Sequence, residues 1–369
     1  MLTQSHYSSS SMLSTILILT LFIIISLFFI APHIIIFHPP PTPSPSIPPS
    51  DEADDVTLFN HALSNSNKLS HLSSNNHNLK LAFLFLTNSN LHFTPLWELF
   101  FHNHPPSLFN IYIHSDPFLN LSLPSSPLFR NRLIPSKRTF RASPTLISAT
   151  RRLLAHSLLD DPSNAYFLVL SQYCIPLHSF RFVYNSLFLS NSFDLSHRQS
   201  QPDPLRLTYR SFVEILSDAP RLWKRYVARG RYAMMPEVPF HKFRVGSQFF
   251  TLTRKHALLV IKDTTLWKKF KIPCYREDEC YPEEHYFPTL LSMADPDGCT
   301  NYTLTNVNWT GTVNGHPYTY RPNEVSPELI TRLRHSNYSE SYLFARKFTP
   351  DCLEPLMQIA KSIIFRDSN

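Results

Sequence analysis

The residues that could act in catalysis or metal binding are most concentrated between Cys274 and Met293. This stretch holds two cysteines and then an apolar segment, and it carries five acidic residues and one histidine: Glu277, Asp278, Glu279, Glu283, Glu284 and His285. Carboxylates this close together occur in solvated loops, in metal sites and as catalytic bases. Glu284 is the candidate base, because the start of the helix expected to run through Leu291 would hold it ionised. The alternative is that Glu283 and Glu284 only stabilise a helix N-terminus.

Metal binding is a second use of such residues. Asp295-Pro-Asp297 matches the Asp-x-Asp motif of metal sites. It follows the proposed base, however, and precedes Gly298-Cys299, as a turn would. Zinc binding through His285 and nearby cysteines lacks paired ligand spacing. We therefore expect no metal site, and we expect Cys274 and Cys280 to close a small disulfide loop that leads into the Glu284 helix.

Hydrophobic periodicity predicts the elements that must position these residues. Short apolar runs at 80–86, 110–114 and 166–170 predict strands, and Thr94-Pro95 and Ser143-Pro144 predict the starts of the intervening helices. This alternation predicts parallel strands in an α/β domain. Ligands bind at the carboxyl ends of such strands. The residues just after the predicted strands are therefore pocket candidates: Thr87, Asp116 and Ser171 to Cys174, including Gln172.

Composition excludes several classes of ligand. The chain has 5 glycines against 32 prolines and contains neither GxGxxG nor GxxxxGK[ST], which argues against a dinucleotide-binding loop or a P-loop. Against this scarcity, Gly246-Ser247-Gln248 stands out as a place where backbone can approach a ligand, with a plain turn as the alternative. The formal charge of +7 is scattered rather than gathered in a basic arm, so it favours an anionic small ligand over nucleic acid.

The N-terminus predicts a membrane anchor. Residues 13–37 are free of charge and long enough to span a bilayer, so we expect a tail at 1–12, an uncleaved signal anchor at 13–37 and a Pro/Ser/Asn-rich stem at 38–78. The folded domain then covers 79–369, on the lumenal side of a single-pass type II membrane protein. All five cysteines lie beyond the span, which suits an oxidising compartment. Four acceptor sequons for N-glycosylation agree with it: Asn120, Asn301, Asn308 and Asn337.

Seven motifs in order resemble the plant branch related to the core-2/I-branching β-1,6-N-acetylglucosaminyltransferases. They lie in roughly residues 80–358 and are Leu81–Leu86 with Trp97-Glu-Leu-Phe-Phe, Ile111-Tyr-Ile-His-Ser-Asp-Pro, Ala149-Thr-Arg-Arg-Leu-Leu-Ala, Phe167-Leu-Val-Leu-Ser-Gln-Tyr-Cys-Ile-Pro-Leu, Gly246-Ser-Gln-Phe-Phe, Cys280-Tyr-Pro-Glu-Glu-His-Tyr-Phe-Pro-Thr and Leu343-Phe-Ala-Arg-Lys-Phe. The chain departs from its nearest relatives at Phe140-Arg141, Gln172, Val245 and Phe249, which bears on acceptor contacts and donor choice more than on the fold.

The resemblance implies a GT-A-type glycosyltransferase fold, a Rossmann-like mixed sheet flanked by helices, in the Golgi membrane. It also implies an inverting, metal-independent reaction in which a UDP-sugar donor gives GlcNAc or glucuronic acid to a glycan or glycoprotein acceptor. Glu284 falls on the family's catalytic base, and Lys347 on the basic residue that binds the donor diphosphate. Arg346 and Arg321 are further candidates for that diphosphate.

Two other interpretations stay open. In the first, the chain is a lumenal glycan-binding or scaffold protein that keeps the fold without turnover. In the second, the chain is a metal-dependent hydrolase built on the acidic stretch. Trp309 and Tyr318–Tyr320 are candidates to stack on a sugar, although aromatic residues make up 13% of the chain and most of them must belong to the core.

Overall fold

The computed structural model describes residues 14–26, 45–70, 79–119, 121–122, 126–188, 209–276, 279–311 and 316–367. The chain divides into two compact units, Met1–Thr42 and Pro43–Asn369. In the first unit, residues 14–26 form a helix with exposed side chains. Within the described ranges, no helix is both long and apolar enough to cross a bilayer. The tail expected at 1–12 and residues 13 and 27–37 of the expected anchor lie outside those ranges, so the anchor stays a prediction.

The second unit is built on a mixed six-stranded sheet in the order β2-β1-β3-β6-β5-β7. Its strands are β1 (Lys80–Thr87), β2 (Phe109–Ser115), β3 (Asn164–Ser171), β5 (Ser211–Glu214), β6 (Thr251–Thr253) and β7 (Cys299–Asn301). The strand β1 pairs in parallel with β2 and β3, and β5 pairs in parallel with β7, whereas β6 is antiparallel to β3 and β5. The three strands predicted by periodicity are therefore confirmed, and their parallel pairing with them.

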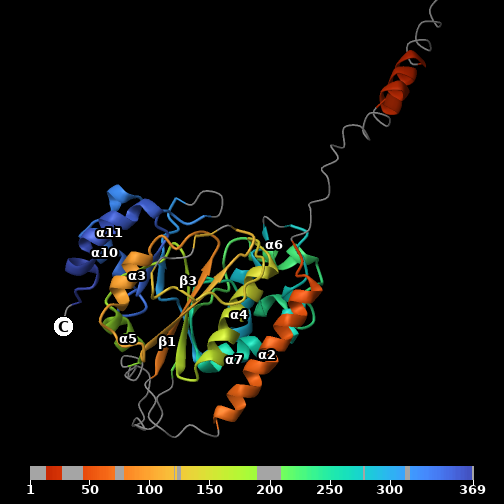
Figure 1. Ribbon diagram of the computed structural model, residues 1–369. Coiled ribbons are helices and arrows are strands. Elements are labelled where there is room, and N and C mark those ends of the chain that lie inside the picture. The colour runs from red at the N-terminus through yellow and green to blue at the C-terminus, as the bar shows by residue number, and fades with distance from the viewer. Residues whose placement is uncertain are drawn as a thin grey trace, which may run out of the picture. The chain divides into compact units, whose positions relative to one another are not determined.

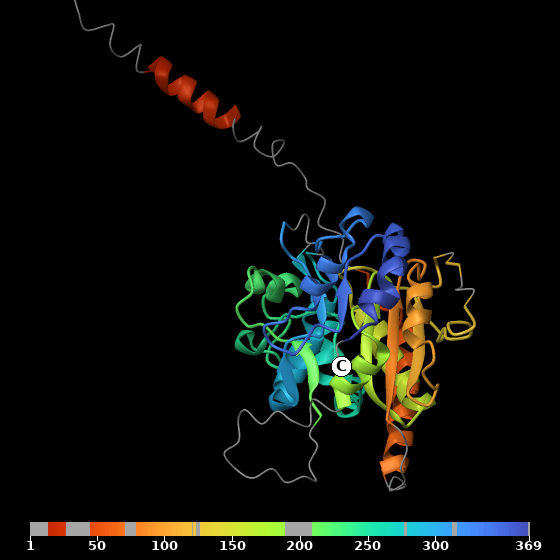
Figure 2. The same ribbon diagram turned by 90° about the vertical axis from the view of Figure 1, so that its left-hand side faces the viewer.

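Helices cover both faces of this sheet (Figure 1, Figure 2). One face carries α2, α4 and α7, and the other carries α3, α5, α10 and α11. The bounds of the helices are α2 (Pro49–Ser70), α3 (Thr94–Phe101), α4 (Pro144–Asp160), α5 (Phe180–Phe188), α6 (Leu222–Tyr226), α7 (Arg254–Lys262), α8 (Thr265–Phe270), α9 (Tyr286–Ala294), α10 (Pro327–Arg334) and α11 (Leu353–Ile359). A second sheet, in the order β4-β9-β8, consists of β4 (Ile175–Pro176), β9 (Phe344–Arg346) and β8 (Thr305–Val307).

The alternation of side chains along the strands creates the two cores. In β1, Ala82 and Leu84 belong to the cluster under α4 and α7, whereas Phe83 and Phe85 belong to the cluster under α3. This is the pattern of a strand that is buried on both faces, which explains why it reads as one apolar run.

The two predicted helix starts differ in outcome. Ser143 caps α4 as predicted, with its side chain accepting a hydrogen bond from the Thr145 N–H. The predicted cap at Thr94 is wrong, because Phe93 occupies the N-cap position and the Thr94 hydroxyl bonds instead to the carbonyl of Leu91.

The stem expected at 38–78 is also wrong in its middle part. Residues 49–70 form α2, which packs on α4 and α7 rather than extending as a linker. Phe59 and Ala62 of α2 are buried, and the carboxylate of Asp55 forms a buried ion pair with Arg152 of α4. The folded unit therefore begins before residue 79. Residues 38–44 and 71–78 lie outside the described ranges.

Candidate active site

Glu284 ends a short 3-10 turn, Pro282–Glu284, that leads into α9. Tyr281 precedes the turn in a left-handed conformation, with φ 42°, and Pro282 supplies a backbone angle suited to a first helical position. The Glu284 N–H donates to the Tyr281 carbonyl at 3.0 Å, and the Gly246 N–H donates to the Glu284 carbonyl at 2.9 Å. The backbone of Glu284 is thus fixed on both sides, at the helix start where the sequence predicted it.

The Glu284 carboxylate is the one acidic side chain of its turn that reaches solvent, and its side chain is 29% exposed. Its Oε2 lies 2.9 Å from Nη1 of Arg225, a residue of α6. Burial raises the pKa of Glu284, while the charges of Arg225, Arg141 and Arg346 act in the opposite direction. The result is a carboxylate with raised basicity that is still held by cations, which is the condition of a general base.

The neighbours of Glu284 point inward. Glu283 is buried, burial raises its pKa to about 8, and its Oε1 accepts from the Ala142 N–H at 3.3 Å. His285 is buried, its Nδ1 lies 2.8 Å from the Arg244 carbonyl, and burial lowers its pKa to about 3. Because both are enclosed in protein, neither is placed to meet an acceptor hydroxyl. Among the described residues Pro282–His285, Glu284 is therefore the candidate base.

The predicted basic residues come close to Glu284 from the second sheet. Arg346 ends β9 with its guanidinium 4.2 Å from the ring centroid of Phe249, and Lys347 follows with Nζ 4.5 Å from the ring centroid of Tyr173. Burial lowers the pKa of both residues, and the charge of Arg346 acts on Glu284. The structure thus brings the predicted base and the predicted diphosphate residues into one site.

Arg321 reaches the same region through its backbone neighbours. Tyr320 bridges to Phe348, and its N–H donates to the Lys347 carbonyl at 2.8 Å. Arg321 itself is exposed, and its own N–H donates to Oε2 of Glu324 at 2.7 Å. An exposed side chain beside the Lys347 strand agrees with a role at the diphosphate, and that role stays a prediction.

The polar residues at the strand ends are mostly engaged with the protein itself. The Thr87 hydroxyl bonds within its own turn, and the Ser171 hydroxyl lies 3.2 Å from Sγ of Cys174. Gln172 donates from Nε2 to Oδ1 of Asn88 at 2.6 Å. Asp116 accepts from the N–H groups of Phe118 and Thr139 and so fixes the loop that leads to α4. These four residues shape the site, and direct ligand contact by them stays a prediction.

The loop at Gly246-Ser247-Gln248 touches the site, but the glycine has a different cause from the one expected. A Cβ at Gly246 would lie 1.9 Å from the carbonyl oxygen of Glu214, so the close approach is that of β5 and not of a ligand. Ser247 accepts from the Phe249 N–H at 3.1 Å, and Gln248 is half-buried. Ligand contact through Ser247 and Gln248 stays a prediction.

Several residues of the site escaped sequence reasoning. Arg225 and Arg141 both act on Glu284, and Glu214 at the end of β5 has a pKa raised by burial and by the charge of Glu284. Nε2 of His316 lies 2.7 Å from Nη1 of Arg141. Two signals were available, the departure from the family pattern at Phe140-Arg141 and the three arginines within 225–231, and neither pointed to Glu284.

Asp295 of the Asp-x-Asp spelling lies in a turn, as its neighbours predicted. Its carboxylate bonds to Lys255 and lies 3.0 Å from Nε2 of His256. Both interactions neutralise it with cationic or donor groups of the protein. The Asp295 carboxylate is therefore already bound to side chains of the protein itself.

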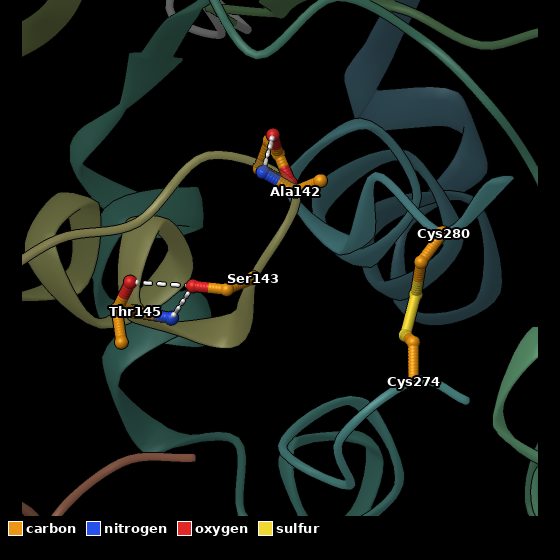
Figure 3. The surroundings of a disulfide bond; sticks show 6 residues. Ala142, Ser143, Thr145, Cys274 and Cys280 are labelled. Atoms are coloured by element: carbon orange, nitrogen blue, oxygen red, sulfur yellow. Dashed lines mark hydrogen bonds between the residues drawn. A yellow bond between two sulfur atoms is a disulfide. The ribbon is translucent and has the colours of Figure 1, made fainter. Parts of the chain in front are cut away.

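The predicted bond between Cys274 and Cys280 is confirmed (Figure 3). Both cysteines are buried and pack with Ala228, which lies three residues after Arg225. The Tyr275 N–H also donates to the Ala228 carbonyl at 2.9 Å. The disulfide loop therefore joins the segment that carries Arg225 to the segment that carries Glu284.

The remaining predicted surface residues differ in setting. Asn301 and Asn337 are exposed, Asn308 is half-buried with Oδ1 accepting from the Thr310 N–H at 2.9 Å, and Trp309 is 51% exposed. Asn120 lies outside the described residues. Occupancy of the sequons and a sugar contact at Trp309 stay predictions.

Comparison with known proteins matches a large part of the folded unit. A family model described as Core-2/I-Branching enzyme matches residues 81–334. The chain is also 28% identical to glycosyltransferase BC10 of Oryza sativa subsp. japonica over 323 residues, which covers 74% of each chain. The matched region includes Glu284, Arg225 and Arg321 and ends before Arg346 and Lys347.

Proposed function

Because the chain belongs to the core-2/I-branching enzyme family of glycosyltransferases, we propose that it transfers one sugar from a UDP-sugar to a hydroxyl of a glycan or glycoprotein acceptor. The proposed reaction is metal-independent and inverts the configuration of the donor carbon. The transferred sugar is GlcNAc or glucuronic acid. We further propose that the protein has a GT-A-type fold. The mixed sheet with helices on both faces supports that fold assignment.

The proposed reaction needs two groups that the site holds together. Glu284 takes the proton of the acceptor hydroxyl while that oxygen forms a bond to the anomeric carbon of the donor. The bond between this carbon and the diphosphate oxygen breaks at the same time, and UDP leaves from the opposite face, which gives inversion. Arg346 and Lys347 stabilise the negative charge that develops on the leaving diphosphate. The observation that carries the proposal is the half-buried Glu284 carboxylate, which lies 2.9 Å from Nη1 of Arg225 and on which the charge of Arg346, the immediate neighbour of Lys347, also acts.

A transfer assay with the full-length chain tests this function. UDP-GlcNAc and UDP-glucuronic acid are supplied separately with acceptor glycans, with and without EDTA. We expect turnover that EDTA leaves unchanged, a product of inverted configuration, and a loss of about 10²–10⁴-fold in Glu284→Gln. Asp297→Asn is the control, because Asp297 belongs to the turn after α9, and it is expected to keep full activity.

The same assay separates the alternatives. Full activity in Glu284→Gln would remove the base assignment, and turnover that EDTA abolishes would favour a metal site. Lys347→Ala is expected to weaken UDP binding in calorimetry, while Glu284→Gln keeps it. Absence of UDP binding in the wild-type chain would favour the glycan-binding or scaffold interpretation.

We also propose that the chain acts in the Golgi lumen as a single-pass type II membrane protein. The charge-free segment at 13–37 and the confirmed disulfide support this location. Digestion of the expressed chain with peptide N-glycosidase tests it. We expect a mass loss that disappears when all four sequon asparagines are replaced by glutamine. An unmodified, protease-accessible domain in sealed vesicles would contradict the proposal.

A further inference from the structure

More cationic side chains lie around Glu284 than the binding of a UDP-sugar requires. Arg141, Arg225 and Arg346 all act on Glu284, and Arg141 and Arg346 act on Lys347. Glu283, the adjacent carboxyl, has a pKa raised to about 8 and adds little negative charge at neutral pH. The proposed function assigns Arg346 and Lys347 to the donor diphosphate. Two arginines therefore remain beside a single ionised base.

These two arginines meet at one aromatic ring. The guanidinium carbon of Arg141 lies 5.7 Å from the ring centroid of Tyr281, and that of Arg225 lies 5.1 Å from the same centroid. Tyr281 has φ 42°, a left-handed conformation that is unfavourable for a tyrosine and persists only where its surroundings impose it. The disulfide at Cys280 on one side and the turn at Pro282 on the other impose it here.

Arg141 is the arginine with unused binding capacity. It is exposed, and the ion pairs of the described chain include none between Arg141 and a carboxylate. Its recorded polar contact is the 2.7 Å one to Nε2 of His316, whose pKa is lowered by burial and by the charges of Arg141, Lys347 and Arg346. A neutral imidazole accepts one hydrogen bond, so most of the five guanidinium donors stay available for an anion.

The backbone that carries Arg141 is held rigidly on both sides. Before it, Oδ2 of Asp116 accepts from the Thr139 N–H at 2.8 Å. After it, the Ala142 N–H donates to Glu283 and Ser143 caps α4, as Figure 3 shows for the segment that faces the disulfide. A fixed backbone lowers the entropic cost of binding, as expected at a site that recognises a ligand group.

We propose that Arg141 and Arg225, arranged around Tyr281, form a subsite for a carboxylate carried by the acceptor, so that the preferred acceptor is an acidic glycan with a uronic acid residue near the reacting hydroxyl. The inference rests on the proposed function. The acceptor, rather than the donor, carries the carboxylate because Arg225 is bonded to Glu284, and the acceptor hydroxyl must reach Glu284. Guanidinium groups suit this role because their planar donors match a carboxylate, and an aromatic ring beneath them supports stacking.

Binding to the full-length chain tests the subsite without requiring turnover. The probes are a β-galactobiose capped with glucuronic acid and the methyl ester of the same trisaccharide, titrated by calorimetry in the presence of UDP. We expect the wild-type chain to bind the acid about tenfold to a hundredfold more tightly than the ester. Arg141→Gln is expected to remove this difference, and Arg141→Lys to keep part of it. Lys224→Gln is the control, because Lys224 is exposed on α6 and its ion-pair partner is Glu279 rather than Glu284.

Each contrary outcome has a distinct meaning. Equal affinity of the wild-type chain for acid and ester would overturn the subsite. An Arg141→Gln defect that appears with UDP-glucuronic acid and is absent with UDP-GlcNAc would assign the carboxylate to the donor and overturn the proposal. Weaker UDP binding by Arg141→Gln would assign Arg141 to the diphosphate, again overturning it. Failure of the wild-type chain to bind UDP or to transfer sugar, with the acid still preferred, would remove the proposed function and leave the subsite.

Discussion

Nη1 of Arg225 lies 2.9 Å from Oε2 of Glu284, and this ion pair opposes the burial that raises the pKa of the candidate base. The two side chains are 25% and 29% exposed, so the pair is accessible to solvent and to substrate. Burial alone would favour a protonated Glu284, which is useless as a base. Arg225 opposes burial and is therefore a positioning residue of the site.

Arg225→Gln is expected to shift the pH dependence of transfer. Removing this cation leaves burial to raise the pKa of Glu284, while Arg141 and Arg346 oppose it. Because the ionised carboxylate is the active form, the acid limb of kcat/KM moves to higher pH. The methyl-ester trisaccharide is the acceptor for this measurement, since it avoids any carboxylate contact. An acid limb that stays in place in Arg225→Gln, as it should in Lys224→Gln, would show that the ion pair does not control the base.

The buried pair of Asp55 and Arg152 predicts that α2 is part of the folded unit. Arg152 donates from Nη2 to Oδ2 of Asp55 at 2.8 Å, and both side chains are buried. Asp55→Ala leaves a buried guanidinium without its carboxylate, which costs about 3–5 kcal/mol of unfolding free energy. Asp54→Ala is the control, because Asp54 is 65% exposed and pairs with Lys137 at the surface, and it should change the unfolding free energy far less than Asp55→Ala does. Equal melting temperatures for the two variants would mean that α2 contributes little stability.

Much of the fold was predictable because its signals are local. The apolar runs of β1 and β3 and the capping residue Ser143 act within a few residues of one another, so periodicity and capping rules detect them. The helix α2 escaped detection because its segment is rich in serine, asparagine and acidic residues. Its buried positions Asp55, Phe59 and Ala62 follow a helical spacing, but one of the three is a carboxylate whose partner lies in α4.

The site divides in the same way. Glu284 and Lys347 could be proposed from the sequence because each lies in a motif that can be recognised within a few residues, and their roles stay predictions. Arg225, Arg141 and Tyr281 were not, because their roles arise from contacts between segments that are distant in the sequence. The glycine at 246 was noticed for its rarity, but its cause is the backbone of β5, which no local pattern reveals.

Gly246→Ala is expected to damage both stability and activity. Its Cβ would lie 1.9 Å from the Glu214 carbonyl oxygen, and neither of the two backbones can move without disturbing β5 or the 2.9 Å bond from Gly246 to Glu284. We expect a loss of about 1–3 kcal/mol in unfolding free energy together with weaker transfer. Gly311→Ala is the comparison, since a Cβ there meets nothing within 4 Å and its φ of +67° is the sole strain. A milder effect at 246 than at 311 would contradict the close approach.

We expect Glu283 to affect the pH dependence of stability, whereas its neighbour Glu284 affects the pH dependence of transfer. Its pKa is raised from 4.5 to about 8 by burial first and by the charge of Glu284 second. A carboxyl whose folded pKa is raised gives stability that is complete below the unfolded pKa and is lost as the pH rises through the folded value. Wild-type stability should therefore fall between about pH 4.5 and pH 8 on account of this group.

Glu283→Gln isolates this contribution because the amide resembles the protonated acid and can still accept from the Ala142 N–H. We expect the variant to keep transfer activity and to exceed the wild-type chain in unfolding free energy by about 1–3 kcal/mol at pH 8, with little difference near pH 4.5. Denaturant titrations at the two pH values measure both. Lower stability of Glu283→Gln at pH 8 would mean that Glu283 is ionised and paired, most directly with the buried Arg229, whose charge it already influences. Loss of activity without loss of stability in Glu283→Gln, together with full activity in Glu284→Gln, would transfer the base assignment to Glu283.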